Sequence, residues 1–150
     1  MKRRSVPAAI TIAVIFIWVG FVGAISFFES WLKFRAPGVT LNTGLSIGRL
    51  VFTTMNRIEW VFLSIAILCT AIQQQKKCFL LALPFLMLLL QTVWLLPALN
   101  RQVALYLENR LSGPAVHHIL FVIAELIKWL SLLAAGIYLL RRTGIQHEPQ

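Results

Sequence analysis

The sequence predicts an all-α protein, a four-span transmembrane helical bundle that forms one integral membrane domain over residues 1–150. Three observations support this fold class. Hydrophobic residues make up 59% of the chain and charged residues only 13%, and the mean hydropathy is +0.80. Apolar runs of about 20 residues, long enough to cross a bilayer, recur along the chain. Polar or proline-containing breaks separate these runs, so we expect spans at about 6–28, 46–72, 78–99 and 115–140.

The first span follows three basic residues at positions 2–4. A secretory signal peptide also begins in this way, but the apolar run 6–28 is longer than the usual signal core, so we expect an uncleaved span. Glu29 and Lys33 follow it, spaced i, i+4 in the order that favours an ion pair on a helix. We expect these two residues at the rim of the membrane.

The second span must include polar residues. Its later part, 60–72, is clearly apolar but too short to cross a bilayer alone. The preceding segment SIGRLVFTTMNRIE therefore enters or borders the membrane, and it carries Arg49, Asn56, Arg57 and Glu59. Arg49 can extend its charge toward the surface, whereas Glu59 lies deeper and needs a partner.

The third span begins at Cys78, after the polar turn QQQKK, and contains Pro84, which we expect to kink it. Trp94 and Pro97 are expected to mark its far end, and Glu108 lies in the following connection, at the rim. Cys78 and Cys69 show no metal or disulfide spacing, so both are expected to be buried apolar residues.

The fourth span contains the stretch AVHHILFVIAELIKWL, which is apolar enough for a bilayer but carries ionisable residues. On a helix, its polar residues fall within one stripe about a quarter of the circumference wide, and these residues are His117, His118, Glu125 and Lys128. A charge near the bilayer centre costs roughly 3 kcal/mol or more, so this stripe is expected to face other helices or a wet cavity.

The basic residues predict the topology. Seven flank the spans on the side of the chain ends and four on the opposite side, namely Lys2, Arg3, Arg4, Lys76, Lys77, Arg141 and Arg142 against Lys33, Arg35, Arg101 and Arg110. The positive-inside rule then places both termini in the cytoplasm of a multi-pass protein of a cell membrane, which we take to be a bacterial inner membrane. The polar residues of all four segments would gather in the outer half of the bundle.

Several functions fit such a cluster. The sequence does not identify a cofactor, but a divalent metal is one candidate, with His118, Glu125 and Glu59 as its ligands. Haem is disfavoured, because adjacent histidines on one helix cannot ligate one iron from both sides. The chain contains no HExxH, phosphate loop or nucleophile motif, so no catalytic residue is assigned and a metal-dependent membrane enzyme ranks below the other hypotheses.

The function that we expect from the sequence is binding or conduction of an ion, a proton, a lipid or a small solute by this cluster. The alternative is a structural or accessory subunit of a larger membrane complex or homo-oligomer, in which the charges fix the register of helices. The net charge of +9 does not indicate nucleic-acid binding, because the basic residues flank the spans.

Short motifs also suggest a family. Phe27-Phe28 ends the first span, Gly48-Arg49-Leu50-Val51-Phe52 opens the second, Trp94 and Pro97 close the third, and His118 opens the fourth. From about Trp18 to Leu139 the chain resembles the small four-helix membrane proteins related to human transmembrane protein 205, a family defined by a domain of unknown function. The family's histidine is typically followed by glycine, whereas Ile119 follows here. The resemblance implies a four-helix architecture and no established reaction.

Overall fold

The structure, a computed structural model, describes residues 6–73, 76–108, 110 and 116–144. Within these residues all regular structure is helical and no strand occurs. Four helices of the described part are long and apolar enough to cross a membrane, and these are Val6–Arg35, Leu41–Ile72, Cys78–Leu107 and Val116–Arg142. The predicted all-α class and the four spans are confirmed, and the chain is a multi-pass membrane protein.

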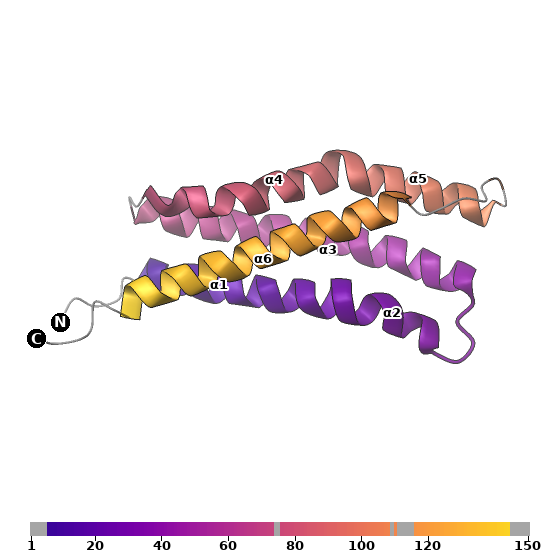
Figure 1. Cartoon of the computed structure of the whole chain (residues 1–150), viewed down its shortest axis with the longest axis horizontal. Helices are drawn as coiled ribbons and strands as arrows, with labels where there is room; N and C mark the ends of the chain where they lie inside the picture. Colours follow the sequence, from indigo (N-terminus) through magenta and orange to yellow (C-terminus); the bar gives the residue numbers. More distant parts are fainter. Residues whose placement is uncertain (1–5, 74–75, 109, 111–115, 145–150) are drawn as a thin grey trace, which may run out of the picture.

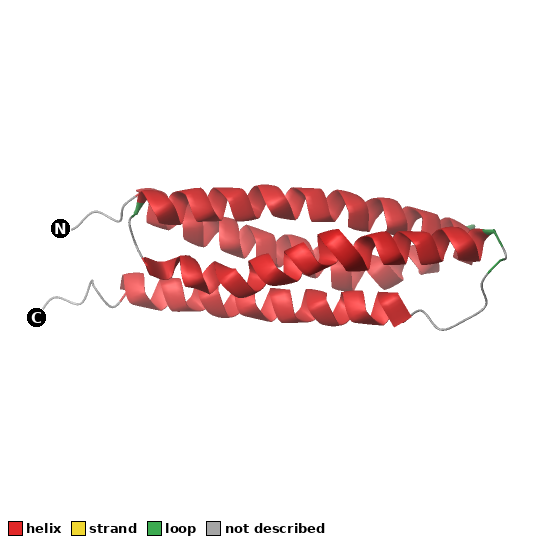
Figure 2. Cartoon of the chain, turned by 90° about the horizontal axis from the view of Figure 1, so that it is seen from above, coloured by secondary structure: helices red, strands yellow, loops and turns green. Residues whose placement is uncertain are grey.

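The four spans lie side by side, and consecutive spans run in opposite directions (Figures 1 and 2). The first span begins and the fourth span ends at one end of the bundle. We call the opposite end, where the first and third spans end and the second and fourth begin, the far end. At the far end the first three spans are longer than predicted, since they reach Arg35, begin at Leu41 and reach Leu107, respectively.

The first span is helical throughout but changes its winding. It consists of α1 (Val6–Val22), a π-helical segment (Gly23–Glu29), the short helix α2 (Ser30–Leu32) and a 3₁₀ turn (Lys33–Arg35). A π segment leaves backbone carbonyls imperfectly paired, and Ser30 Oγ donates to such carbonyls at Ser26 (2.6 Å) and Ile25 (3.2 Å).

A short turn leads from the first span into the second. Ala36 leaves the helix with extended backbone, and Gly38 has a φ of 81°, a conformation that glycine adopts without steric cost. Thr40 then caps α3 (Leu41–Ile72) by accepting a hydrogen bond from the Thr43 amide at 3.2 Å. With 32 residues, α3 is about 48 Å long, which exceeds the thickness of a bilayer core.

The third span starts with a 3₁₀ segment (Lys76–Leu81) and continues through α4 (Ala82–Leu90), a π segment (Gln91–Leu95) and α5 (Leu96–Leu107). The kink predicted at Pro84 is wrong in position. Pro84 lies in the first turn of α4, where a missing amide hydrogen breaks no helical bond. The visible bend lies between α4 and α5, at the π segment and Pro97 (Figure 1).

The fourth span belongs to α6 (Val116–Gly144), which packs on α1, α4 and α5. The bundle core has two apolar layers. One lies toward the chain ends and contains Ile15, Val22, Leu63, Ala66, Leu88 and Leu132. The other lies toward the far end and contains Phe52, Met55, Leu95, Leu99, Phe121 and Ala124. Between these two layers lie buried polar residues of the second, third and fourth spans, namely Asn56, Glu59, Gln91, Glu125 and Lys128.

Candidate functional site

Lys128 is the centre of a buried polar network. Its side chain is fully buried in the fourth span, and its Nζ lies 2.6 Å from Oε1 and 2.7 Å from Oε2 of Glu59 in the second span. The same ammonium donates to Glu125 Oε2, one helical turn away, at 3.1 Å. It also donates to Gln91 Oε1 in the third span at 2.7 Å. Lys128 therefore has acceptors for all three of its hydrogens.

Two further hydrogen bonds complete the network, and one of them connects it to the first span. Trp18 of the first span donates its indole hydrogen to Glu59 Oε1 at 2.8 Å, and Gln91 Nε2 donates to Glu125 Oε2 at 2.5 Å. All five side chains are at most 1% exposed. We call Trp18, Glu59, Gln91, Glu125 and Lys128 the ionic layer, because each of the four spans contributes at least one member and the layer separates the two apolar cores.

The ionic layer contains more carboxylates than cations. Two glutamates share one ammonium, so the formal charge is −1 when both carboxylates are ionised. Glu125 Oε1 is buried and has no hydrogen-bond partner among the described residues. Desolvation of charges in a buried pair is costly and is offset only by good geometry, which Glu59 and Lys128 have. Glu125 is the less well satisfied of the two acids.

A smaller polar ladder joins the second and third spans. Trp60 Nε1 donates to Thr92 Oγ1 at 2.9 Å, and Thr92 Oγ1 lies 3.1 Å from Asn56 Oδ1. Asn100 Nδ2 approaches Thr53 Oγ1 at 3.5 Å, nearer the far end. These neutral contacts fix the packing of the two spans without burying further charge.

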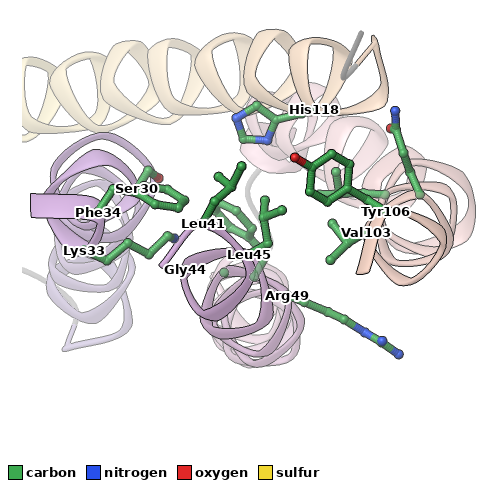
Figure 3. Close-up of a pocket in the computed structure, with 14 residues that line it drawn as sticks. Ser30, Lys33, Phe34, Leu41, Gly44, Leu45, Arg49, Val103, Tyr106 and His118 are labelled. Atoms are coloured by element: carbon green, nitrogen blue, oxygen red, sulfur yellow. The ribbon is translucent and has the colours of Figure 1, made fainter. Parts of the chain in front are cut away.

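A cavity of about 300 Å³ opens at the far end of the bundle (Figure 3). All four spans line it, and we call it the far-end pocket. Most of its lining is apolar and aromatic, and the lining residues are Ser30, Lys33, Phe34, Leu41, Gly44, Leu45, Gly48, Arg49, Phe52, Leu99, Gln102, Val103, Tyr106 and His118. No member of the ionic layer lines this cavity, so the two features lie at different levels of the bundle.

Lys33 supplies the charge inside the far-end pocket. Its side chain is only 9% exposed, and its ammonium lies 3.3 Å from Glu29 Oε2. The ammonium also lies 5.6 Å from the ring centre of Phe34 and 5.3 Å from that of Phe52. Aromatic faces attract a cation but are weak acceptors of hydrogen bonds. Lys33 therefore retains hydrogen-bonding capacity toward a ligand in the pocket.

Two glycines of α3 make the room for this arrangement. A Cβ atom added to Gly44 would lie 2.2 Å from Phe34 Cε1, so only glycine accommodates the ring there. A Cβ atom on Gly48 would lie 3.1 Å from Lys33 Nζ. The segment Gly44–Gly48 thus forms the surface against which Phe34 and the Lys33 ammonium rest.

The predicted polar residues divide between the two levels. Glu59, Glu125 and Lys128 come together in the ionic layer, whereas Lys33, Arg49 and His118 line the far-end pocket. Figure 3 shows the Arg49 side chain extending away from the cavity and the His118 ring facing it. The polar residues that were expected to gather in one cluster in the outer half of the bundle therefore lie at two separate levels.

Other predicted residues lie outside both features. His117 Nδ1 lies 3.1 Å from Gln102 Oε1 and so connects α6 with α5. Arg57 is exposed on α3, and Glu108 forms an exposed ion pair with Arg110 at 3.5 Å. Exposed pairs of this kind contribute little to stability. Cys69 is buried as predicted, but Cys78 is exposed.

The proposed metal ligands do not converge. Among the described residues, no three His, Cys, Asp or Glu side chains are grouped so that they could hold a metal ion. His118 lies against Phe52, with ring centres 6.4 Å apart, while Glu59 and Glu125 both face Lys128. The ammonium of Lys128 occupies the position between the carboxylates that a bound cation would need, so the set His118, Glu125 and Glu59 is not supported.

Comparison of the chain with family models, curated proteins and solved structures finds no match. The resemblance to proteins related to transmembrane protein 205 therefore stays a prediction, and the function rests on the geometry of the site.

Sequence reasoning missed residues that the site requires. Gln91 is an amide in an otherwise apolar run, and Trp18 is an indole far from the ends of its span, where tryptophan is usually found. Either departure could have marked a buried hydrogen-bonding partner. Phe34, Gly44 and Tyr106 carry no comparable signal, because their roles depend on how the helices pack around the pocket.

Proposed function

We propose that this protein is a non-enzymatic membrane protein that binds an anionic amphiphile in its far-end pocket. The observation that carries the proposal is the nearly buried ammonium of Lys33 within a mostly apolar cavity of about 300 Å³. A cavity of this size with few polar groups is typical of small-molecule sites. An acidic group would pair with Lys33, and its apolar portion would contact the surrounding leucine, valine and aromatic side chains.

The pocket lining favours an anion over a cation. It includes the Lys33 ammonium but no aspartate or glutamate. Glu29 pairs with Lys33 without lining the cavity, so the carboxylate lies outside the pocket while the lysine lines it. A charge-assisted hydrogen bond from this ammonium to a phosphate or carboxylate is the strongest contact that the site offers.

The ionic layer is proposed to be the scaffold of the pocket. Its five side chains join all four spans, and its cation already has three acceptors, which leaves no position for an added cation. The charged stripe faces inward and is paired within the chain, so it gives no support to the alternative of an accessory subunit held by a partner helix. We further propose that both termini are cytoplasmic in a bacterial inner membrane, which places the far-end pocket in the outer half.

Equilibrium binding of dodecyl phosphate tests the proposal. The protein would be purified in an uncharged detergent, and the affinities of wild type, Lys33→Gln and Arg101→Gln would be compared. Arg101→Gln removes an exposed charge near the same end without altering the pocket lining. We expect Lys33→Gln to weaken binding by about tenfold or more, since a hydrogen bond to a charged group contributes about 1.5–3 kcal/mol. Equal affinity of all three proteins would refute the proposed function.

A further inference from the structure

Side chains around the far-end pocket indicate where the pocket lies across the thickness of the membrane. Exposed aromatic side chains surround this end of the bundle, and they include Phe28, Trp31, Phe34 and Tyr106. Arg35 lies over the Trp31 ring, with its guanidinium carbon 4.6 Å from the ring centre. Tryptophan and tyrosine concentrate at membrane–water interfaces, beside lipid headgroups. The pocket therefore lies at headgroup depth.

At this depth the anionic groups present at highest concentration are lipid phosphates. Lys33 presents a compact cation to the pocket, whereas the Arg49 side chain extends away from it (Figure 3). A single ammonium inside a mostly apolar cavity suits a headgroup phosphate that is partly enclosed. Leu41, Leu45 and Val103 supply apolar surface for the adjoining glycerol and acyl portion.

The same lining disfavours a zwitterionic headgroup. A choline or ethanolamine group is bound by carboxylates or by open aromatic faces, and no carboxylate lines this pocket. Two aromatic rings that could receive such a cation, Phe34 and Phe52, already lie beside the Lys33 ammonium. A headgroup with a net negative charge is therefore the better complement.

We propose that the far-end pocket is a binding site for the phosphate headgroup of an anionic phospholipid. This assignment rests on the proposed function, because it names the source of the anionic amphiphile that binds there. Lys33 contacts the phosphate, and Gly48 holds the ammonium at its position on the cavity wall.

Native mass spectrometry of the protein in uncharged detergent tests the assignment. Phosphatidylglycerol and phosphatidylcholine would be added at equal concentration to wild type, Lys33→Gln, Lys33→Arg and Arg101→Gln. We expect wild type to retain phosphatidylglycerol at least tenfold better than phosphatidylcholine. Lys33→Gln should lose this preference, while Lys33→Arg should retain part of it and Arg101→Gln all of it. Circular dichroism would verify that each variant is helical.

The outcomes separate the two proposals. If wild type binds dodecyl phosphate through Lys33 but retains both phospholipids equally, the lipid assignment is overturned and the proposed function stands. If millimolar inorganic phosphate displaces phosphatidylglycerol, the site takes a free phosphate and the lipid assignment is again overturned. If the binding of dodecyl phosphate and the binding of phosphatidylglycerol are both independent of Lys33, both proposals fail.

Discussion

The ammonium of Lys128 lies 2.6 Å from Glu59 Oε1, although 69 residues separate the two in sequence and both side chains are fully buried. This contact links the fourth span to the second. It also fixes the positions of Gln91 and Trp18, which bind the lysine and the glutamate respectively. Alignment of the helices at this level determines how they meet at the far end, where the pocket forms.

The charge balance of the ionic layer predicts unequal effects of two substitutions. Lys128→Met leaves Glu59 and Glu125 buried without a cation, so we expect a loss of about 3–5 kcal/mol in unfolding free energy. Glu125→Gln keeps an acceptor for Lys128 and leaves one carboxylate per ammonium, so the change should stay within about 1 kcal/mol. Unfolding in uncharged detergent, followed by circular dichroism, measures both. A larger loss for Glu125→Gln than for Lys128→Met would contradict the described charge balance.

The indole of Trp18 is predicted to stabilise the ionised Glu59. Trp18→Phe keeps the ring in the apolar core but removes the donor to Oε1, and we expect a loss of about 1–3 kcal/mol. The matched control is Trp94→Phe, because Trp94 is 54% exposed on the third span and its replacement should change stability by less than about 0.5 kcal/mol. Equal unfolding curves for the two variants would show that the indole hydrogen bond contributes nothing.

The sequence was sufficient to predict the number of spans and the inward-facing stripe of Glu125 and Lys128. These features follow from hydropathy and helical periodicity, which depend on local sequence alone. The separation of His118 from Glu125 could not be predicted, because two residues on one stripe can still lie two turns apart and face different neighbours. Which of Arg49, Arg57 and Lys128 would pair with Glu59 also depends on the relative rotation of the helices, and local sequence does not specify that rotation.

The glycines of α3 give a prediction that separates binding from stability. Gly48→Ala should displace the Lys33 ammonium by a few tenths of an ångström and lower the affinity for dodecyl phosphate several-fold, while helix propensity keeps stability unchanged or slightly higher. Gly20→Ala, where no atom lies within 4 Å of the new Cβ, should raise stability and leave affinity unchanged. Unchanged affinity in Gly48→Ala would mean that the ammonium position does not control binding.

Substitution of Gly44, on the same surface of α3, is predicted to have a stronger effect than substitution of Gly48. Gly44→Ala forces the Phe34 ring out of its position, so we expect losses in both stability and dodecyl phosphate affinity. Thermal unfolding and equilibrium binding on the same preparation measure the two effects. Retention of both properties would show that Phe34 relocates without altering the pocket.

Chemical labelling of Cys78 tests the proposed topology. It is exposed at the end of the bundle where α1 begins, whereas Cys69 is buried. With both termini in the cytoplasm, a membrane-impermeant maleimide should label Cys78 in inverted membrane vesicles and not in intact cells. A Cys78→Ser variant gives the background. Labelling of wild type in intact cells would reverse the orientation and place the far-end pocket on the cytoplasmic side.

The separation of a binding pocket from a structural ionic layer is tested most directly by the shift in melting temperature that dodecyl phosphate causes. At a fixed concentration, a ligand that binds the folded state stabilises it more when it binds more tightly, so the shift reports binding in each variant. We expect a similar upward shift in wild type and Glu125→Gln, and little or none in Lys33→Gln. A shift that persists in Lys33→Gln but disappears in Glu125→Gln would place the binding site in the ionic layer and contradict this assignment of roles.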